Sequence, residues 1–293
     1  MPNQKEIKAL ISLLDDPDEQ IYAQIKSKLI SFGQEVIPEL ENYWEHNSFG
    51  VIFQDRIENI IHKIQFDKTS FDIKQWSKGS ASNLLDFAIL ISKYQYPDLN
   101  EDKILKKVEQ LERDVWIEMN NDLTAFEKVK VLNHILFDVH GFIGNKKNYH
   151  APQNSYINNV IDTKKGNPLT LSLLYYIIAQ RLNLPIYGVN LPNHFVLCYL
   201  DEHAIMKIIE PGTSQDDDVL FYINPFSRGT IFNRDEIYAF LKQLNLDPQQ
   251  SYFEPCNNKD IAKRIINNLI YSYEKLGYVD KVEELEILKS YFQ

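Results

Sequence analysis

The sequence predicts an α+β fold, in which helical regions flank a core made of one buried helix and an antiparallel sheet. Three observations support this prediction. Apolar side chains recur at helical spacing through roughly the first 120 residues. Residues Pro168–Leu182 are apolar on nearly every helical face, as expected for a helix that is buried on all sides. Short apolar runs separated by turn residues follow Pro185 and indicate strands.

Residues 1–120 are assigned to a helical region. A first helix with one apolar face ends at Asp15-Asp16-Pro17, and a second ends at Gly33. This order of helix, turn, helix and glycine resembles a HEAT-type repeat, so we expect a HEAT-like region. Further helices are expected over the ranges Val51–Ile64, Leu84–Tyr94 and Asp102–Met119.

Residues 121–250 are assigned to the core. A helix over Ala125–Phe137 is expected to turn Phe126 inward together with Val129 and Leu132. The next segment is rich in Gly, Asn, Lys and Pro, which predicts a loop with one short helix near Ser155–Val160. Strands are expected over Ile186–Leu191, Phe195–Leu200, Ala204–Glu210 and Val219–Asn224.

Residues 251–293 are assigned to a helical tail. Two helices broken at Gly277 resemble a tetratricopeptide-type hairpin. Glycine suits the end of a helix because it adopts the left-handed conformation at little cost. No Gly/Ser-rich linker separates the tail or the N-terminal region from the core.

Charge and composition exclude several classes of function. The net charge of −10 disfavours binding to a phosphate backbone, so we expect no nucleic-acid partner. No apolar run is long enough to span a bilayer, and the sequence start does not read as a signal peptide. Cys198 and Cys256 are too few for a disulfide framework, which predicts a cytoplasmic protein. No motif for a metal or cofactor is present, so none is expected.

Several separated motifs in the core resemble the transglutaminase-like superfamily, and specifically its bacterial SirB-like branch. Four of them are GFIGN from Gly141, KGNP from Lys165, LPNHF from Leu191, and INPFSRG over Ile223–Gly229. The branch has IDPF where this chain has INPF. The resemblance covers roughly residues 124–246. It implies a papain-like core with a central helix packed on an antiparallel sheet.

The resemblance also implies a catalytic arrangement that this chain does not complete. In active relatives a Cys at the N-terminus of the central helix is paired with a His on a strand and with an Asp or Asn. The helix terminus and the His lower the pKa of the thiol, and the third group orients the imidazole. Here Pro168 takes the Cys position, His194 matches the His, and Asn224 matches the orienting residue. Glu210 competes with Asn224 by its spacing from His194.

Other groups could in principle replace the missing thiol. Thr170 and Ser172 lie within about one turn of Pro168, but a hydroxyl is a weak nucleophile without a closely placed base. We expect both hydroxyls to bond to the preceding helical turn. Cys198, on the same strand as His194, is interpreted as a buried structural thiol.

The leading interpretation is a non-catalytic transglutaminase-like protein that acts as a cytoplasmic regulator or protein-binding module through its remnant cleft. Its partner would be a protein or peptide, with Tyr149, Asn154 and Asn167 as predicted binding residues. The alternative is a cysteine-independent hydrolase or acyl-transferase that uses His194 with Asn224 or Glu210. A purely structural module, with a sealed cleft, is the third possibility.

Overall fold

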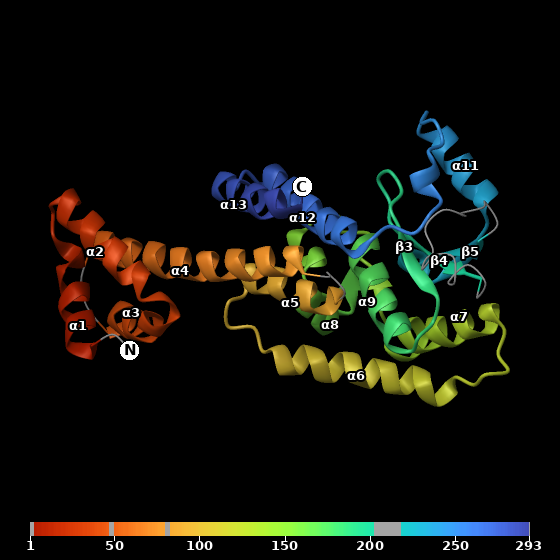
Figure 1. Cartoon of the computed structure of the whole chain (residues 1–293), viewed down its shortest axis with the longest axis horizontal. Helices are drawn as coiled ribbons and strands as arrows, with labels where there is room; N and C mark the ends of the chain where they lie inside the picture. The colour runs from red at the N-terminus through yellow and green to blue at the C-terminus, as the bar shows by residue number, and fades with distance from the viewer. Residues whose placement is uncertain (1–2, 47–49, 80–82, 202–217, 293) are drawn as a thin grey trace. The chain divides into compact units, whose positions relative to one another are not determined.

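The chain forms two compact units in the computed structural model, which describes residues 3–46, 50–79, 83–201 and 218–292. The first unit comprises Met1–Gln75 with Lys93–Pro97, and the second comprises Trp76–Ser92 with Asp98–Gln293. Figure 1 shows the helices of the N-terminal part in red and orange, and the sheet in green to cyan. The predicted α+β class with helical regions at both ends is confirmed.

The first unit is built from short helices followed by a long one. The elements are α1 Gln4–Ser12, α2 Glu19–Ser31, α3 Ile37–His46 and α4 Val51–Lys78, the last of which continues beyond this unit. Asn3 and Asp18 cap α1 and α2 by accepting backbone N–H bonds. The buried guanidinium of Arg56 donates to the carbonyls of Leu14 and Asp16, which fixes the turn between α1 and α2 on α4.

The α4 helix extends well past Ile64, where the sequence predicted its end. It continues because residues 65–78 contain neither Gly nor Pro and keep apolar groups such as Phe66 and Ile73 on buried positions. The HEAT-like character of this region stays a prediction.

The second unit contains the remaining helices and the sheet. Its helices are α5 Leu84–Gln95, which continues into the first unit, α6 Glu101–Glu118, α7 Ala125–Asn133, α8 Ile157–Thr163, α9 Pro168–Arg181, α11 Arg234–Gln243, α12 Asn258–Leu276 and α13 Val279–Lys289. A π-helical turn over His134–Val139 extends α7. The inward orientation predicted for Phe126 is wrong, since this side chain is 45% exposed and lies under the Lys130 ammonium, 4.5 Å from its ring centroid.

The α9 helix is the centre of this unit, as predicted. All of its residues from Pro168 to Ala179 are buried, and it packs against the sheet strands β3 Ile186–Val189 and β4 Val196–Leu200. Its first-turn position suits Pro168, because a proline lacks only an N–H that has no partner within the helix. A helix buried on every side can hold its N-terminus at a fixed place in the core.

The described residues form a four-stranded antiparallel sheet in the order β3-β4-β5-β6, where β5 is Val219–Asn224 and β6 is Thr230–Phe232. The pairing places Leu197 opposite Ile223, so the start of β4 lies beside the end of β5. The sequence did not predict β6, nor the parallel pair of β1 Ile143–Gly144 with β2 Lys165–Gly166. The strand predicted over Ala204–Glu210 lies outside the described residues.

The C-terminal helices α12 and α13 form a hairpin that turns at Gly277, whose φ of 77° is left-handed. The hydroxyls of Tyr156 and Tyr273 are 3.0 Å apart, which connects α12 directly to the segment before α8. Whether residues 251–293 form a separate tetratricopeptide-like domain stays a prediction. Within the described residues, no helix is both long and apolar enough to cross a bilayer.

We predict that Ile178→Ala in α9 lowers the free energy of unfolding by about 2–5 kcal/mol, because it opens a cavity at a fully buried position. Urea denaturation measures the effect. Ile287→Ala, at a position 47% exposed on α13, is the matched control and should cost less than about 1 kcal/mol. Equal losses in the two variants would show that α9 is not the central packing element.

Candidate functional site

The N-terminus of α9 is held by a buried polar cap. The side-chain oxygen of Asn167 accepts from the Thr170 N–H at 2.9 Å and from the Thr170 hydroxyl at 3.1 Å. Its amide nitrogen donates to the Ser155 hydroxyl at 3.0 Å. Pro168 follows as the first residue of the helix. The cap fixes where α9 begins and anchors this end of the helix to the loop that precedes α8.

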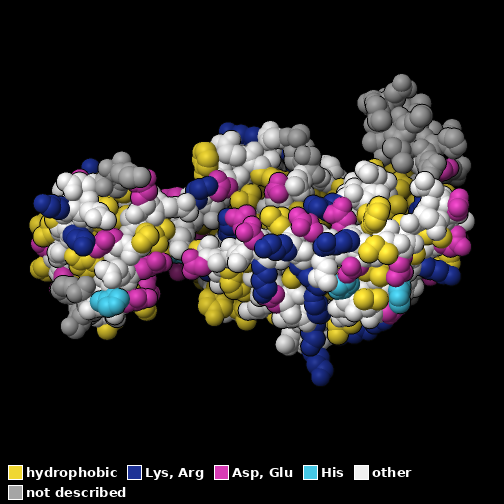
Figure 2. Space-filling model, turned by 90° about the horizontal axis from the view of Figure 1, so that it is seen from below, with side chains coloured by type: hydrophobic (Ala, Val, Ile, Leu, Met, Phe, Trp, Pro, Cys, Tyr) yellow, Lys and Arg dark blue, Asp and Glu magenta, His cyan; other side chains and the backbone are white. Residues whose placement is uncertain are grey.

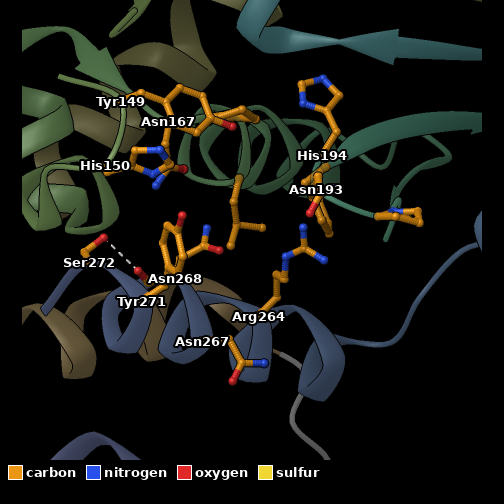
Figure 3. Close-up of a pocket in the computed structure, with 14 residues that line it drawn as sticks. Tyr149, His150, Asn167, Asn193, His194, Arg264, Asn267, Asn268, Tyr271 and Ser272 are labelled. Carbon is orange, nitrogen blue, oxygen red and sulfur yellow. Dashed lines mark hydrogen bonds between the residues drawn. The ribbon is translucent and has the colours of Figure 1, made fainter. Parts of the chain in front are cut away.

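A pocket of about 670 Å³ opens at this end of α9. Figure 3 shows residues of α12 along one side, the Tyr149–His150 segment on another, and the segment before β4 opposite. The lining residues are Tyr149, His150, Asn167, Pro168, Leu169, Pro192, Asn193, His194, Phe195, Arg264, Asn267, Asn268, Tyr271 and Ser272. The pocket therefore brings together the predicted nucleophile position and the predicted His.

His194 lies two residues before β4, rather than within the strand as expected, and its ring is half-buried. Burial lowers the pKa of this ring, and the positive charge of Arg264 lowers it further. A side-chain hydrogen bond with Asn224 opposes both effects and favours the protonated ring. Burial is the largest of the three, so the imidazole is neutral at pH 7.

Asn224 ends β5 and lies next to His194 because β4 and β5 are paired neighbours. The Asn224 side-chain oxygen also accepts from the Ser227 N–H at 3.3 Å, which closes the turn after the strand. The structure thus brings His194 and Asn224 together, whereas Glu210 lies outside the described residues. Their catalytic roles stay predictions.

Neither hydroxyl on α9 is placed as a nucleophile. Thr170 is 1% exposed, and its hydroxyl donates to Asn167 within the cap. Ser172 is fully buried and donates to the Phe195 carbonyl at 3.4 Å. The expected bond to the preceding turn is wrong for Ser172, whose acceptor is a carbonyl of the segment before β4, and Thr170 bonds to the side chain rather than the carbonyl of Asn167, three residues back. Cys198 is buried in the sheet, and burial raises the pKa of its thiol.

The three predicted binding residues differ in position. Asn167 and Tyr149 line the pocket, and Tyr149 is 37% exposed at its rim. Asn154 is buried away from the lining: it accepts from Asn145 at 2.9 Å and donates to the carbonyls of Asn148 and Tyr149. Asn154 therefore shapes the segment that carries Tyr149 but has no surface in the pocket.

The α12 wall was missed by the sequence analysis. Arg264, Asn268 and Tyr271 are spaced by four and three residues, so they share one helical face and line the pocket together. This spacing was visible in the sequence as a polar stripe on an amphipathic helix. What the sequence did not reveal is that this stripe faces the N-terminus of α9.

No group of three His, Cys, Asp or Glu residues in the described ranges is arranged to hold a metal ion. The pair of His134 and Asp138, with 3.2 Å between ring nitrogen and carboxylate, lies outside the pocket, and Asp138 also pairs with Arg228.

A sequence profile of the Transglutaminase-like superfamily matches residues 102–267, more than half of the chain, so the protein belongs to this superfamily. The match extends from α6 into α12 and so includes most of the pocket. Membership of the SirB-like branch is compatible with the comparisons and stays a prediction.

Curated relatives include UPF0162 proteins of two Xylella fastidiosa strains, each 28% identical. The match to the 9a5c strain covers 68% of this chain and 67% of that protein, and the match to the Temecula1 strain covers 53% and 50%. Human F-box only protein 21 is 29% identical over 47% of this chain but only 20% of its own length. The chain thus spans between a fifth and two thirds of these relatives. No solved structure matches.

We predict that the His194 ring titrates below the ordinary value of about 6.5, because burial and Arg264 disfavour the charged form. As the pH falls, the imidazole is therefore protonated at a higher pH in the unfolded protein than in the folded one. The free energy of unfolding then decreases as the pH drops below about 6.5. His194→Ala removes the contribution of this ring to the pH dependence. NMR of the ring C–H resonances measures the pKa. A midpoint at or above 6.5 would contradict the burial argument.

Proposed function

We propose that this transglutaminase-like protein is non-catalytic and that its remnant cleft binds a segment of a partner protein or a peptide. Such binding would make it a regulator or interaction module, which we place in the cytoplasm. One observation carries the proposal: Pro168 begins α9 and lines the pocket, at the position to which the resemblance assigns the nucleophilic Cys of active relatives.

A proline ring can neither lose a proton to the imidazole nor attack a carbonyl. The neighbouring hydroxyls of Thr170 and Ser172 are buried and engaged in hydrogen bonds. Among the described residues, the pocket lining contains no thiol, and its one serine, Ser272, is 5% exposed and donates its hydroxyl to the Asn268 carbonyl at 2.8 Å.

The pocket is suited to binding because it reaches the solvent and offers mixed chemistry. Tyr149 and Tyr271 are exposed at its edges, while Leu169 and Phe195 provide buried apolar surface. A volume of about 670 Å³ is within the range of ordinary ligand sites. Related sequence also occurs as a small part of a much longer chain in F-box only protein 21, which supports its use as a module.

The hydrogen-bonded pair of His194 and Asn224 favours one alternative. A neutral imidazole oriented by an amide could activate a water molecule, as in a cysteine-independent hydrolase or acyl-transferase. Glu210 was the other predicted orienting group. In this alternative the pocket would bind an ester or amide substrate, and turnover would depend on His194.

Photo-crosslinking in the native cytoplasm tests the binding proposal. We replace Tyr271, 46% exposed on the pocket rim, by the photoreactive residue p-benzoylphenylalanine and expect a defined higher-mass adduct after irradiation. Tyr238, 42% exposed on α11 and outside the pocket lining, is the matched control. Adducts at both positions in equal yield, or at neither, would contradict a partner-binding pocket.

A screen with ester and amide substrates separates binding from catalysis. We expect no turnover above background from the wild-type protein, because the described pocket lining has no thiol and its Ser272 hydroxyl is bonded to a backbone carbonyl. His194→Ala, checked by thermal melting, is the comparison. Turnover by the wild type that falls at least tenfold in this variant would establish the hydrolase alternative.

A further inference from the structure

Among the residues that the structure describes, the pocket lining has no acidic side chain, although the protein as a whole is acidic. The net charge is −10, and acidic and basic side chains are interspersed over the face seen in Figure 2. None of the residues that line the pocket is Asp or Glu. The permanent charge on this lining is therefore the single guanidinium of Arg264. This local charge is opposite in sign to the charge of the whole chain.

Arg264 is half-buried on α12 and lacks a carboxylate partner among the described residues. Its guanidinium donates to the Asn190 side-chain oxygen at 2.8 Å, and no carboxylate of the described residues forms an ion pair with it. Figure 3 shows the guanidinium directed across the pocket toward Asn193 and His194. A partly desolvated cation without a counter-charge is costly, and an anionic ligand would remove that cost.

We propose that the pocket binds a peptide segment through a carboxylate, which pairs with the guanidinium of Arg264. This inference rests on the proposed binding function and specifies its ligand. A carboxylate fits the guanidinium in a two-pronged hydrogen-bonded pair, and a single Arg neutralises one negative charge. A phosphate dianion would need a second cation, but the His194 ring is neutral at pH 7.

The remainder of the lining suits the backbone of a peptide. The side-chain amides of Asn193 and Asn268 form no hydrogen bond with another described residue, and Figure 3 shows the Asn268 amide pointing into the pocket. Each amide can donate and accept, and each peptide unit presents one donor and one acceptor. The exposed rings of Tyr149 and Tyr271 supply apolar contact beside them.

The N-terminus of α9 adds a weaker contribution in the same direction. The N–H of Leu169 has no acceptor among the described residues, since the cap oxygen of Asn167 serves Thr170. The positive end of the helix dipole favours negative charge at this place. The N-terminus of α9 thus adds to the attraction of a ligand carboxylate that pairs with Arg264.

NMR titration with acetyl-tetraalanine tests the inference, because this probe presents only a backbone, methyl groups and a C-terminal carboxylate. We expect shifts at pocket resonances with the free acid and at least tenfold weaker binding of the C-terminal amide. A second amidated peptide, with one Glu in place of an Ala, shows whether a side-chain carboxylate can bind in place of the C-terminal carboxylate. Sodium phosphate is the small-anion comparison, for which we expect no saturable shift.

Arg264→Gln should weaken the free acid by about 10- to 100-fold, as expected for the loss of hydrogen bonds to a charged group. Arg113→Gln, which makes the same charge change at an exposed position of α6 outside the pocket, should leave binding unchanged. Arg264→Lys keeps the charge, so it should bind the free-acid peptide more weakly than the wild type but more tightly than Arg264→Gln does. If Arg264→Gln does not fold, Arg264→Lys is used as the test variant instead.

Equal binding of the free acid and the amide, or no loss in either Arg264 variant, would overturn the carboxylate assignment but leave peptide binding intact. Saturable phosphate binding that depends on Arg264 would replace the peptide by a small anion. If no peptide shifts the pocket resonances while Tyr271 still crosslinks a partner, only this inference fails. If both experiments are negative, the proposed function fails as well.

Discussion

The three hydrogen bonds of Asn167 are the interaction on which the candidate site depends. They cap the Thr170 N–H in the first turn of α9, fix the start of the helix at Pro168, and anchor that start to Ser155. Because the helix behind them is buried on every side, its N-terminus cannot shift without disturbing the core. The head of a helix is where a thiol would be activated, and here a cap and a proline take that place.

In the proposed non-catalytic site, the groups around Pro168 serve to bind a ligand. Burial and the charge of Arg264 lower the pKa of the His194 ring, and the hydrogen bond with Asn224 opposes this shift. Arg264 carries a charge because a guanidinium keeps its proton in proteins at neutral pH. The described part of the pocket lining is thus cationic, amide-rich and free of carboxylates, which supports the proposal that the pocket binds a ligand.

The features of the fold that could be predicted are those that depend on local sequence patterns and motifs. The buried α9 helix followed from its apolar faces, and the proximity of His194 to Asn224 followed from a resemblance in which the Asn orients the imidazole. The position of α12 beside the pocket could not be predicted from local sequence. It depends on contacts between distant segments, such as the hydrogen bond of Arg264 to Asn190, which lies 74 residues earlier in the chain. The strand β6 was missed since three residues are too short for an alternating pattern to register.

The reactivity of Pro168→Cys tests most directly whether Pro168 occupies a catalytic position. The new thiol would lie at the N-terminus of α9, in the pocket with His194. Burial raises the pKa of Cys256 to about 12 and that of Cys198 further, so neither native thiol competes for alkylation. The pH dependence of iodoacetamide alkylation, followed by mass spectrometry, should give a pKa below the ordinary value of about 8.5 at residue 168, and His194→Ala should raise it. An ordinary pKa that does not respond to His194, or a thiol that iodoacetamide cannot reach, would contradict the account of a catalytic site that has lost its nucleophile.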